Sequence, residues 1–162
     1  MLDLATFLLA LGCGLVAGVF FAFSTFVMKA LGKLPPAQGV AAMQSINVVV
    51  LNPWFLTVFV GTAAGGLALL LAALLRWEAD PRAPYWLAGS VLYLLGTFLE
   101  TGIAHVPRND ALAGVAPNSL EAARMWASYL PRWTAWNHVR TIAALAAAAA
   151  FTLAFRLAGR GV

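Results

Sequence analysis

Four long stretches of apolar residues are separated by three connections in which prolines and polar residues gather. The stretches cover residues of about 4–28, 53–75, 83–105 and 132–157. Each approaches or exceeds the roughly 20 residues that a helix needs to cross the hydrocarbon core of a bilayer. Because backbone polar groups in lipid must be satisfied internally, we predict that all four are helices. The pattern therefore indicates an all-α integral membrane four-helix bundle, with residues 1–162 as a single transmembrane domain.

The two longer connections lie on one side of this bundle, because an even number of spans places both termini on the other side. We name the side of the longer connections side A and the side of the termini side B. The first connection predicts a short helix that starts at Pro35-Pro36 and continues to Leu51. Asn52 then has the position of an N-cap, with Pro53 as the first residue of the second span.

The third connection predicts a second short helix. Its segment Asn118-Ser119-Leu120-Glu121 resembles a capping box, in which two polar side chains bond to free N–H groups at a helix start. We expect this helix to continue to about Leu130 and to end at Pro131. Short extra helices in the first and third connections would therefore cover the side A end of the bundle.

Composition agrees with a membrane protein and excludes other classes. Of the 162 residues, 62% are hydrophobic and 10% are charged, whereas soluble domains have about 25% charged residues. The formal net charge of +4 is spread over the loops without a basic, aromatic-rich cluster, so we expect contact with the lipid bilayer and no nucleic acid. Cys13 is the only cysteine, which excludes a disulfide within the chain and a CxxC-type thiol oxidoreductase.

Basic residues are divided almost equally between the two sides, so the positive-inside rule separates them poorly. The basic residues of side B lie in short segments, which favours cytoplasmic termini. We therefore expect a multi-pass protein with four spans, of the kind found in a bacterial-type inner membrane. A homo-oligomer is left open.

The fourth span contains polar residues that a lipid-facing helix does not need. One helical face is formed by Trp133, Trp136, Asn137, Arg140 and Thr141. We expect this face to point into the bundle, with His138 on its flank. An ionisable residue inside a membrane span is costly, so it marks a functional site by default.

Depth relates this face to a carboxylate on the third span. Arg140 follows Pro131 by nine residues, which places it about 13 Å into the span from side A. Glu100 precedes Pro107 by seven residues, or about 10 Å from the same side. The two charges can therefore lie at similar depth, either in a working site or as an ion pair that fixes the register of the helices.

Other polar residues converge on the same end, and side B has no comparable group. The candidate catalytic residues are Glu100, Asn137, His138 and Arg140. The candidate ligand-binding residues are Ser24, Asn47, Asn52, His105, Asn109, Trp133 and Trp136. We predict a polar pocket in the side A half of the bundle, walled by aromatic residues and roofed by the longer connections.

These residue types support acid–base chemistry on an apolar ligand. His138 or Glu100 would be the base for a weakly acidic C–H group. Arg140 and Asn137 would stabilise an enolate-like oxygen or orient the ligand. Tryptophan walls suit a lipophilic small molecule that arrives from the bilayer.

A metal or haem site built on Glu100, His105 and His138 is an alternative. On a regular helix Glu100 and His105 lie about 140° apart. The helix would therefore have to break near Pro107 to turn His105 inward.

Four segments, in order along nearly the whole chain, resemble the anthrone oxygenase-like family of small four-helix membrane proteins. They are Gly18-Val19-Phe20-Phe21-Ala22-Phe23-Ser24-Thr25-Phe26-Val27-Met28, Met43-Gln44-Ser45-Ile46-Asn47, His105-Val106-Pro107-Arg108-Asn109-Asp110-Ala111-Leu112 and Trp133-Thr134-Ala135-Trp136-Asn137-His138-Val139-Arg140-Thr141. The resemblance implies oxidation of anthrones to anthraquinones with molecular oxygen as co-substrate and no conventional cofactor. The family pattern usually has asparagine where this chain has His105.

The sequence is thus interpreted as a membrane oxidoreductase, similar to an oxygenase, that acts on a lipophilic aromatic ligand of anthrone or quinol type. Two alternatives stay open. One is a non-enzymatic membrane protein that binds or helps to transport a small molecule. The other is a metal- or haem-binding membrane protein that uses the set named above.

Overall fold

The four apolar stretches are helical in the computed structural model, which describes residues 1–158. In chain order the elements are α1 (Leu2–Ala22), η1 (Phe23–Val27), α2 (Met28–Leu31), α3 (Pro36–Val49), α4 (Pro53–Leu75), α5 (Ala83–Tyr93), η2 (Leu94–Leu99), η3 (Thr101–His105), α6 (Val106–Ala113) and α7 (Leu120–Ala158). The η elements are π-helical turns that continue the α-helices beside them. No strand occurs in the part of the chain that the structure describes.

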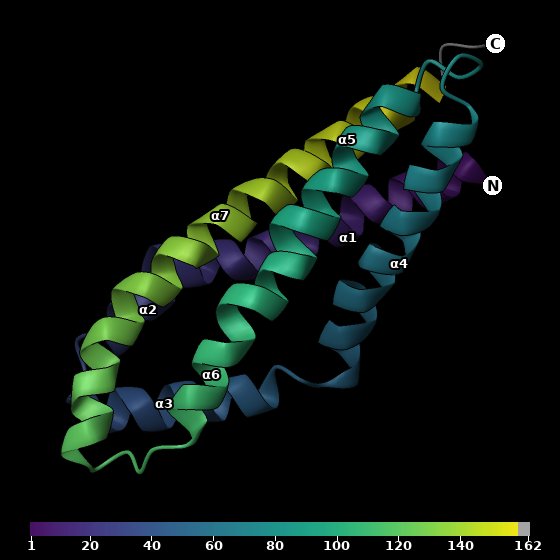
Figure 1. Ribbon diagram of the computed structural model, residues 1–162. Coiled ribbons are helices and arrows are strands. Elements are labelled where there is room, and N and C mark those ends of the chain that lie inside the picture. Colours follow the sequence, from purple (N-terminus) through teal and green to yellow (C-terminus); the bar gives the residue numbers. More distant parts are fainter. Residues whose placement is uncertain (159–162) are drawn as a thin grey trace.

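Four continuous helical units are long and apolar enough to cross a membrane. They are Leu2–Leu31, Pro53–Leu75, Ala83–Ala113 and Leu120–Ala158. The start of α1 and the end of α7 lie at the same end of the bundle, and α3 crosses the opposite end (Figure 1). The predicted all-α fold of a multi-pass membrane protein is confirmed.

The first connection folds as the sequence predicts. α3 starts at Pro36, and the side chain of Asn52 accepts a hydrogen bond of 3.0 Å from the backbone N–H of Phe55. The same side chain donates to the carbonyl oxygen of Val49 at 3.0 Å. Asn52 therefore ends one helix and begins the next, which holds α3 across the side A end.

The prediction that Pro131 ends a separate helix is wrong. Pro131 lies inside α7, which runs without a break from Leu120 to Ala158. The helix does begin in the predicted segment, where the hydroxyl of Ser119 accepts a hydrogen bond of 3.0 Å from the N–H of Ala122. Proline removes one backbone hydrogen bond from a helix and crowds the preceding turn. The helix continues because the large side chains on both sides of Pro131 are buried in the same packing.

Two packed regions divide the bundle along its length. Toward side B, the indole N–H of Trp86 donates to the hydroxyl of Thr6 at 2.9 Å, and the hydroxyl of Tyr93 donates to the backbone oxygen of Phe59 at 3.0 Å. Toward side A, the buried residues are Met28, Leu31, Val40, Met43, Leu112, Ala122, Trp126, Tyr129 and Trp133. Asn137, Arg140 and Glu100 lie between these two regions.

Candidate functional site

A π-helical turn brings His105 toward Glu100. In η3 the N–H of Val106 donates to the carbonyl oxygen of Thr101, five residues earlier, so the turn is wider than an α-helical turn. Residues five apart, which diverge on an α-helix, come nearly above one another on such a turn. The sequence suggested a break near Pro107 for this purpose, but η3 turns His105 inward before that proline.

Glu100 and His105 form a buried pair. The exposed fractions of the two residues are 8% and 1%. The Nδ1 atom of His105 lies 3.2 Å from Oε1 of Glu100, although the two atoms are not aligned for a good hydrogen bond. Within residues 1–158, Oε2 of Glu100 and Nε2 of His105 have no hydrogen-bond partner. Buried polar atoms without partners are rare, so the pair is a strong candidate for contact with a ligand.

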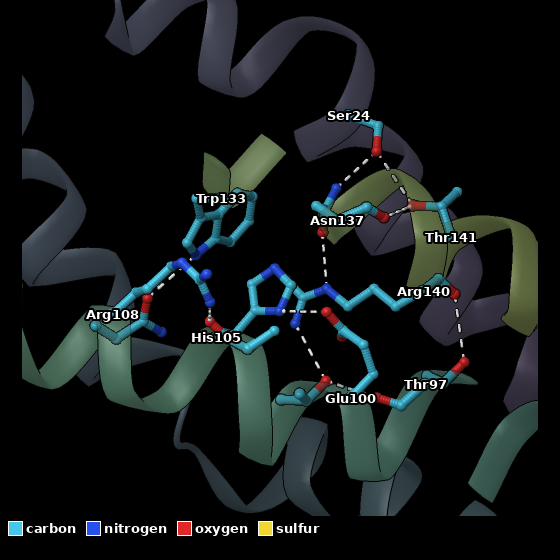
Figure 2. Close-up of polar contacts among 12 residues, drawn as sticks. Ser24, Thr97, Glu100, His105, Arg108, Trp133, Asn137, Arg140 and Thr141 are labelled. Atoms are coloured by element: carbon cyan, nitrogen blue, oxygen red, sulfur yellow. Dashed lines mark hydrogen bonds and ion pairs between the residues drawn. The ribbon is translucent and has the colours of Figure 1, made fainter. Parts of the chain in front are cut away.

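Arg140 is held by neutral groups instead of by the carboxylate that the sequence suggested. Its Nε donates to Oδ1 of Asn137 at 2.8 Å, and its Nη1 donates to the hydroxyl of Thr101 at 3.3 Å. Its guanidinium carbon lies 3.8 Å from the ring centroid of Phe20 and 5.0 Å from that of Trp133. Figure 2 shows Arg140, His105 and Glu100 close together. The structure therefore places a buried cation beside the Glu100–His105 pair without a direct ion pair to it.

A layer of hydrogen bonds from α1 and η1 fixes the amide that holds Arg140. Nδ2 of Asn137 donates to the backbone oxygen of Phe20 and to the hydroxyl of Ser24, both at 2.7 Å. The hydroxyls of Ser24 and Thr141 lie 3.1 Å apart (Figure 2). Because the amide nitrogen is occupied in this way, Oδ1 of Asn137 must face Arg140. Ser24 and Asn137 thus support the site from behind.

A cavity of about 390 Å³ opens beside these groups, under α3. Its walls come from α1, η1, α3, α4, η3, α6 and α7. The polar residues on its surface include Gln44, Asn47, Thr101, His105, Asn109, Asp110 and Arg140. Its aromatic residues are Phe20, Phe23, Phe55, Phe59 and Trp133. The cavity is therefore mainly apolar, with polar groups at separate points, as is typical of sites for small organic molecules.

Asn109 is positioned by two aromatic residues of α7. The hydroxyl of Tyr129 donates to Oδ1 of Asn109 at 2.7 Å, and the indole N–H of Trp133 donates to the same atom at 3.1 Å. The Trp133 ring also meets the His105 ring edge to face, with centroids 4.8 Å apart. Trp133 therefore links the two polar parts of the cavity.

Six of the predicted site residues do not line this cavity. Glu100, Asn137 and Ser24 lie behind the residues that do, and the three others lie farther away. Asn52 caps α4, as described above. Trp136 is 42% exposed, and His138 is also exposed. Both lie on the outer side of α7 because the buried stripe is narrower than the face inferred from helical spacing. His138 is therefore separated from Glu100 and His105, and no cluster of three metal-binding side chains occurs among the described residues.

Other residues at the site were missed by sequence reasoning. Phe20, Phe55 and Phe59 line the cavity. In the sequence of an apolar helix, nothing distinguishes them from phenylalanines that pack in the core or face lipid. Tyr129 was not among the candidate residues, although it is buried against Asn109. Its position one turn before Trp133 on the same helical face was a usable signal.

Comparison with known proteins identifies the family. The family model described as anthrone oxygenase matches residues 54–150, which include most of α4, all of α5 and α6, and the polar part of α7. No curated protein and no solved structure was found to match the chain. Since the family model covers more than half of the sequence, the chain belongs to the anthrone oxygenase family.

Proposed function

We propose that this protein is a membrane oxygenase that oxidises a flat, lipophilic aromatic molecule of anthrone type with molecular oxygen. The observation that carries the proposal is the buried Glu100–His105 pair beside Arg140, in which His105 and Arg140 line a mainly apolar cavity and Glu100 lies behind them. Family membership supports oxygen chemistry, and the four apolar helices agree with a substrate that is dissolved in the bilayer.

His105 is the proposed base. Its Nδ1 faces Glu100, so Nε2 is the nitrogen that can accept a proton from a ligand. Glu100 is the proposed positioning residue, because its carboxylate lies 3.2 Å from Nδ1 of His105 and would stabilise the imidazolium that forms. The family pattern usually has asparagine at this position, so a histidine base would distinguish this chain from most of its relatives.

In the proposed reaction, His105 removes a proton from a ring CH₂ group of the anthrone, and the electron pair of the C–H bond enters an enolate. The enolate carbon is oxidised by O₂ and forms a C–O bond. The peroxide anion takes a proton back from the imidazolium of His105, and the resulting hydroperoxide loses water, so one oxygen atom becomes a new carbonyl group and the other leaves as water. Anthrone and O₂ thus give anthraquinone and water.

Arg140 supplies positive charge next to this chemistry. Negative charge passes from the enolate to the oxygen adduct, and a fixed cation in a water-poor site stabilises such charge without reorganisation. Arg140 is suited to this role because its hydrogen-bond partners, Asn137 and Thr101, are neutral, so no carboxylate bonds directly to its guanidinium.

The test compares the two histidines of the chain. Wild type, His105→Gln and His138→Gln are purified in lipid nanodiscs and supplied with anthrone, and anthraquinone absorbance and O₂ uptake are recorded against empty nanodiscs. We expect kcat to fall by about 100-fold or more for His105→Gln, because a general base contributes at least that much. His138→Gln should retain wild-type turnover. Loss of turnover in His138→Gln with full activity in His105→Gln would refute the assignment.

A further inference from the structure

The cavity has a second group of polar atoms, about one helical turn from the Glu100–His105 pair toward side A. Asn109 follows His105 by four residues in α6, which corresponds to about 6 Å along the helix. Asn47, on α3, lines the same cavity. The proposed reaction gives neither asparagine a role.

Asn109 is oriented so that its amide nitrogen is the atom left for a ligand. The indole N–H of Trp133 can only donate, so the atom of Asn109 that it meets must be the oxygen. The hydroxyl of Tyr129 donates to the same oxygen. With Oδ1 occupied by two donors, Asn109 presents Nδ2 as its free hydrogen-bonding group.

Asn47 also presents an amide nitrogen. Its Nδ2 is buried and makes no hydrogen bond of good geometry within residues 1–158, although the hydroxyl of Tyr129 lies near the same amide. A buried donor without a partner destabilises the fold, so an acceptor oxygen that meets it is favoured. The neighbouring amide of Gln44 cannot serve in its place, because its Nε2 already donates to the backbone oxygens of Leu112 and Val115, at 2.8 and 3.0 Å.

Trp133 spans the space between the Glu100–His105 pair and the two asparagines. One part of its indole faces Arg140 and His105, while its N–H reaches Asn109. A flat ring system that lies along this indole would therefore reach the His105 end with one edge and the asparagines with the opposite edge.

We propose that Asn47 and Asn109 form an oxygen-binding subsite, which holds a carbonyl oxygen of the ligand across the ring from the C–H group that faces His105. This inference rests on the proposed function and narrows its substrate class. A substrate must carry an acceptor oxygen on the ring edge opposite the reactive carbon. The same two amides would stabilise the enolate oxygen when the proton leaves.

Binding of two unreactive probes tests the subsite separately from catalysis. Anthracene and anthraquinone have the same three-ring skeleton, but only anthraquinone carries oxygen on opposite edges of the central ring. Their Kd values are measured by quenching of tryptophan fluorescence in nanodiscs, for wild type, Asn47→Leu, Asn109→Asp and Asn118→Leu. Asn118 is an exposed control in the connection before α7. Asn109→Asp keeps an oxygen for Tyr129 and Trp133 but loses the N–H donors.

We expect wild type to prefer anthraquinone. Asn47→Leu should weaken anthraquinone binding about fivefold, the effect of one neutral hydrogen bond, and leave anthracene binding nearly unchanged. Asn109→Asp should also lower the preference, and Asn118→Leu should keep it. An unchanged preference in both cavity variants overturns the subsite, and the proposed function then depends on the histidine experiment alone. If wild type binds neither probe, the aromatic ligand class and the subsite are both wrong.

Discussion

Asn137 connects three helical segments through one side chain. Its nitrogen donates to Phe20 and Ser24, and its oxygen accepts from Arg140, so each polar atom of the amide is used. A buried guanidinium is costly to desolvate, and the loss of one of its partners costs more than the loss of a surface hydrogen bond. Asn137 therefore contributes to both the stability of the bundle and the position of Arg140.

Replacing this amide should destabilise the protein. We expect Asn137→Leu, which has a similar volume, to lower the free energy of unfolding by about 2–3 kcal/mol, because it leaves Nε of Arg140 buried without an acceptor. Thr152→Ala is the control, since the hydroxyl of Thr152 is exposed and bonds only within its own helix. Unfolding by SDS in mixed micelles, followed by circular dichroism, gives both values. Equal stability of the two variants would show that the network contributes little.

Which side chains of a helix point to the interior was predictable only for residues in the centre of each buried stripe. Helical spacing correctly placed Asn137, Arg140 and Thr141 toward the interior, where all three are buried. Trp136 and His138 lie at or beyond the edge of the same stripe. Spacing cannot decide such positions, because their burial depends on where the neighbouring helices are.

At the scale of elements, the four spans were predictable from the length of their apolar stretches. The helix α3 was predictable from the Pro-Pro pair at its start and the Asn-Pro pair that follows it. The π-helical turns were not, because an α-helical period was assumed throughout. η3 is the element that changes the chemistry, since it pairs His105 with Glu100. π-helical turns occur often at functional sites, and a span with polar residues that a regular helix cannot bring together is a signal for one.

The contact between η2 and α7 depends on a residue without a side chain. A Cβ atom on Gly96 would lie 2.6 Å from the Cβ of Ala143, which is attached directly to a backbone and cannot move aside. We expect Gly96→Ala to separate these helices and to lower the free energy of unfolding by about 1–3 kcal/mol. Gly14→Ala is the matched control, because nothing lies within 4 Å of a Cβ there.

The control should change stability in the opposite direction. Alanine is favoured over glycine in a helix by up to about 1 kcal/mol, so Gly14→Ala should be neutral or stabilising. Unfolding of both variants in the same micelles measures the difference. Destabilisation of Gly14→Ala to the same degree would indicate that α1 packs against something other than lipid at that position.

At the scale of the whole molecule, Glu100, His105 and Arg140 are buried in one half of the bundle. The side B half is filled mainly by apolar side chains; Trp86 and Tyr93 each make one hydrogen bond there, and the buried hydroxyl of Ser90 makes none among the described residues. The cavity is bounded by α3 toward side A and is not continued by polar residues toward side B. This arrangement suits a ligand site better than a path through the membrane.

The side B end is held together by charges outside the spans. Arg82 donates from Nε and Nη2 to the two oxygens of Asp80, at 2.8 and 2.7 Å, and from Nη1 to Asp3 near the start of α1. The hydrogen bonds from Arg82 hold the pKa of Asp80 below its ordinary value of 3.8. Arg82 thus joins the N-terminal end of the chain to the connection between α4 and α5.

Acid should weaken this end of the bundle. Because the pKa of Asp80 is lower in the folded protein than in the unfolded chain, its contribution to stability is complete above the ordinary pKa of 3.8 and is lost as the pH falls through the lower folded value. We expect the Tm of wild type to fall below that pH more steeply than the Tm of Asp80→Asn, which has no carboxyl to protonate at this position. Thermal unfolding in nanodiscs across this range measures both curves. Parallel curves would mean that the Asp80–Arg82 pair does not stabilise the fold. Measured in the same samples, probe binding should be less affected, because the cavity lies in the other half of the bundle, between α3 and the buried Arg140.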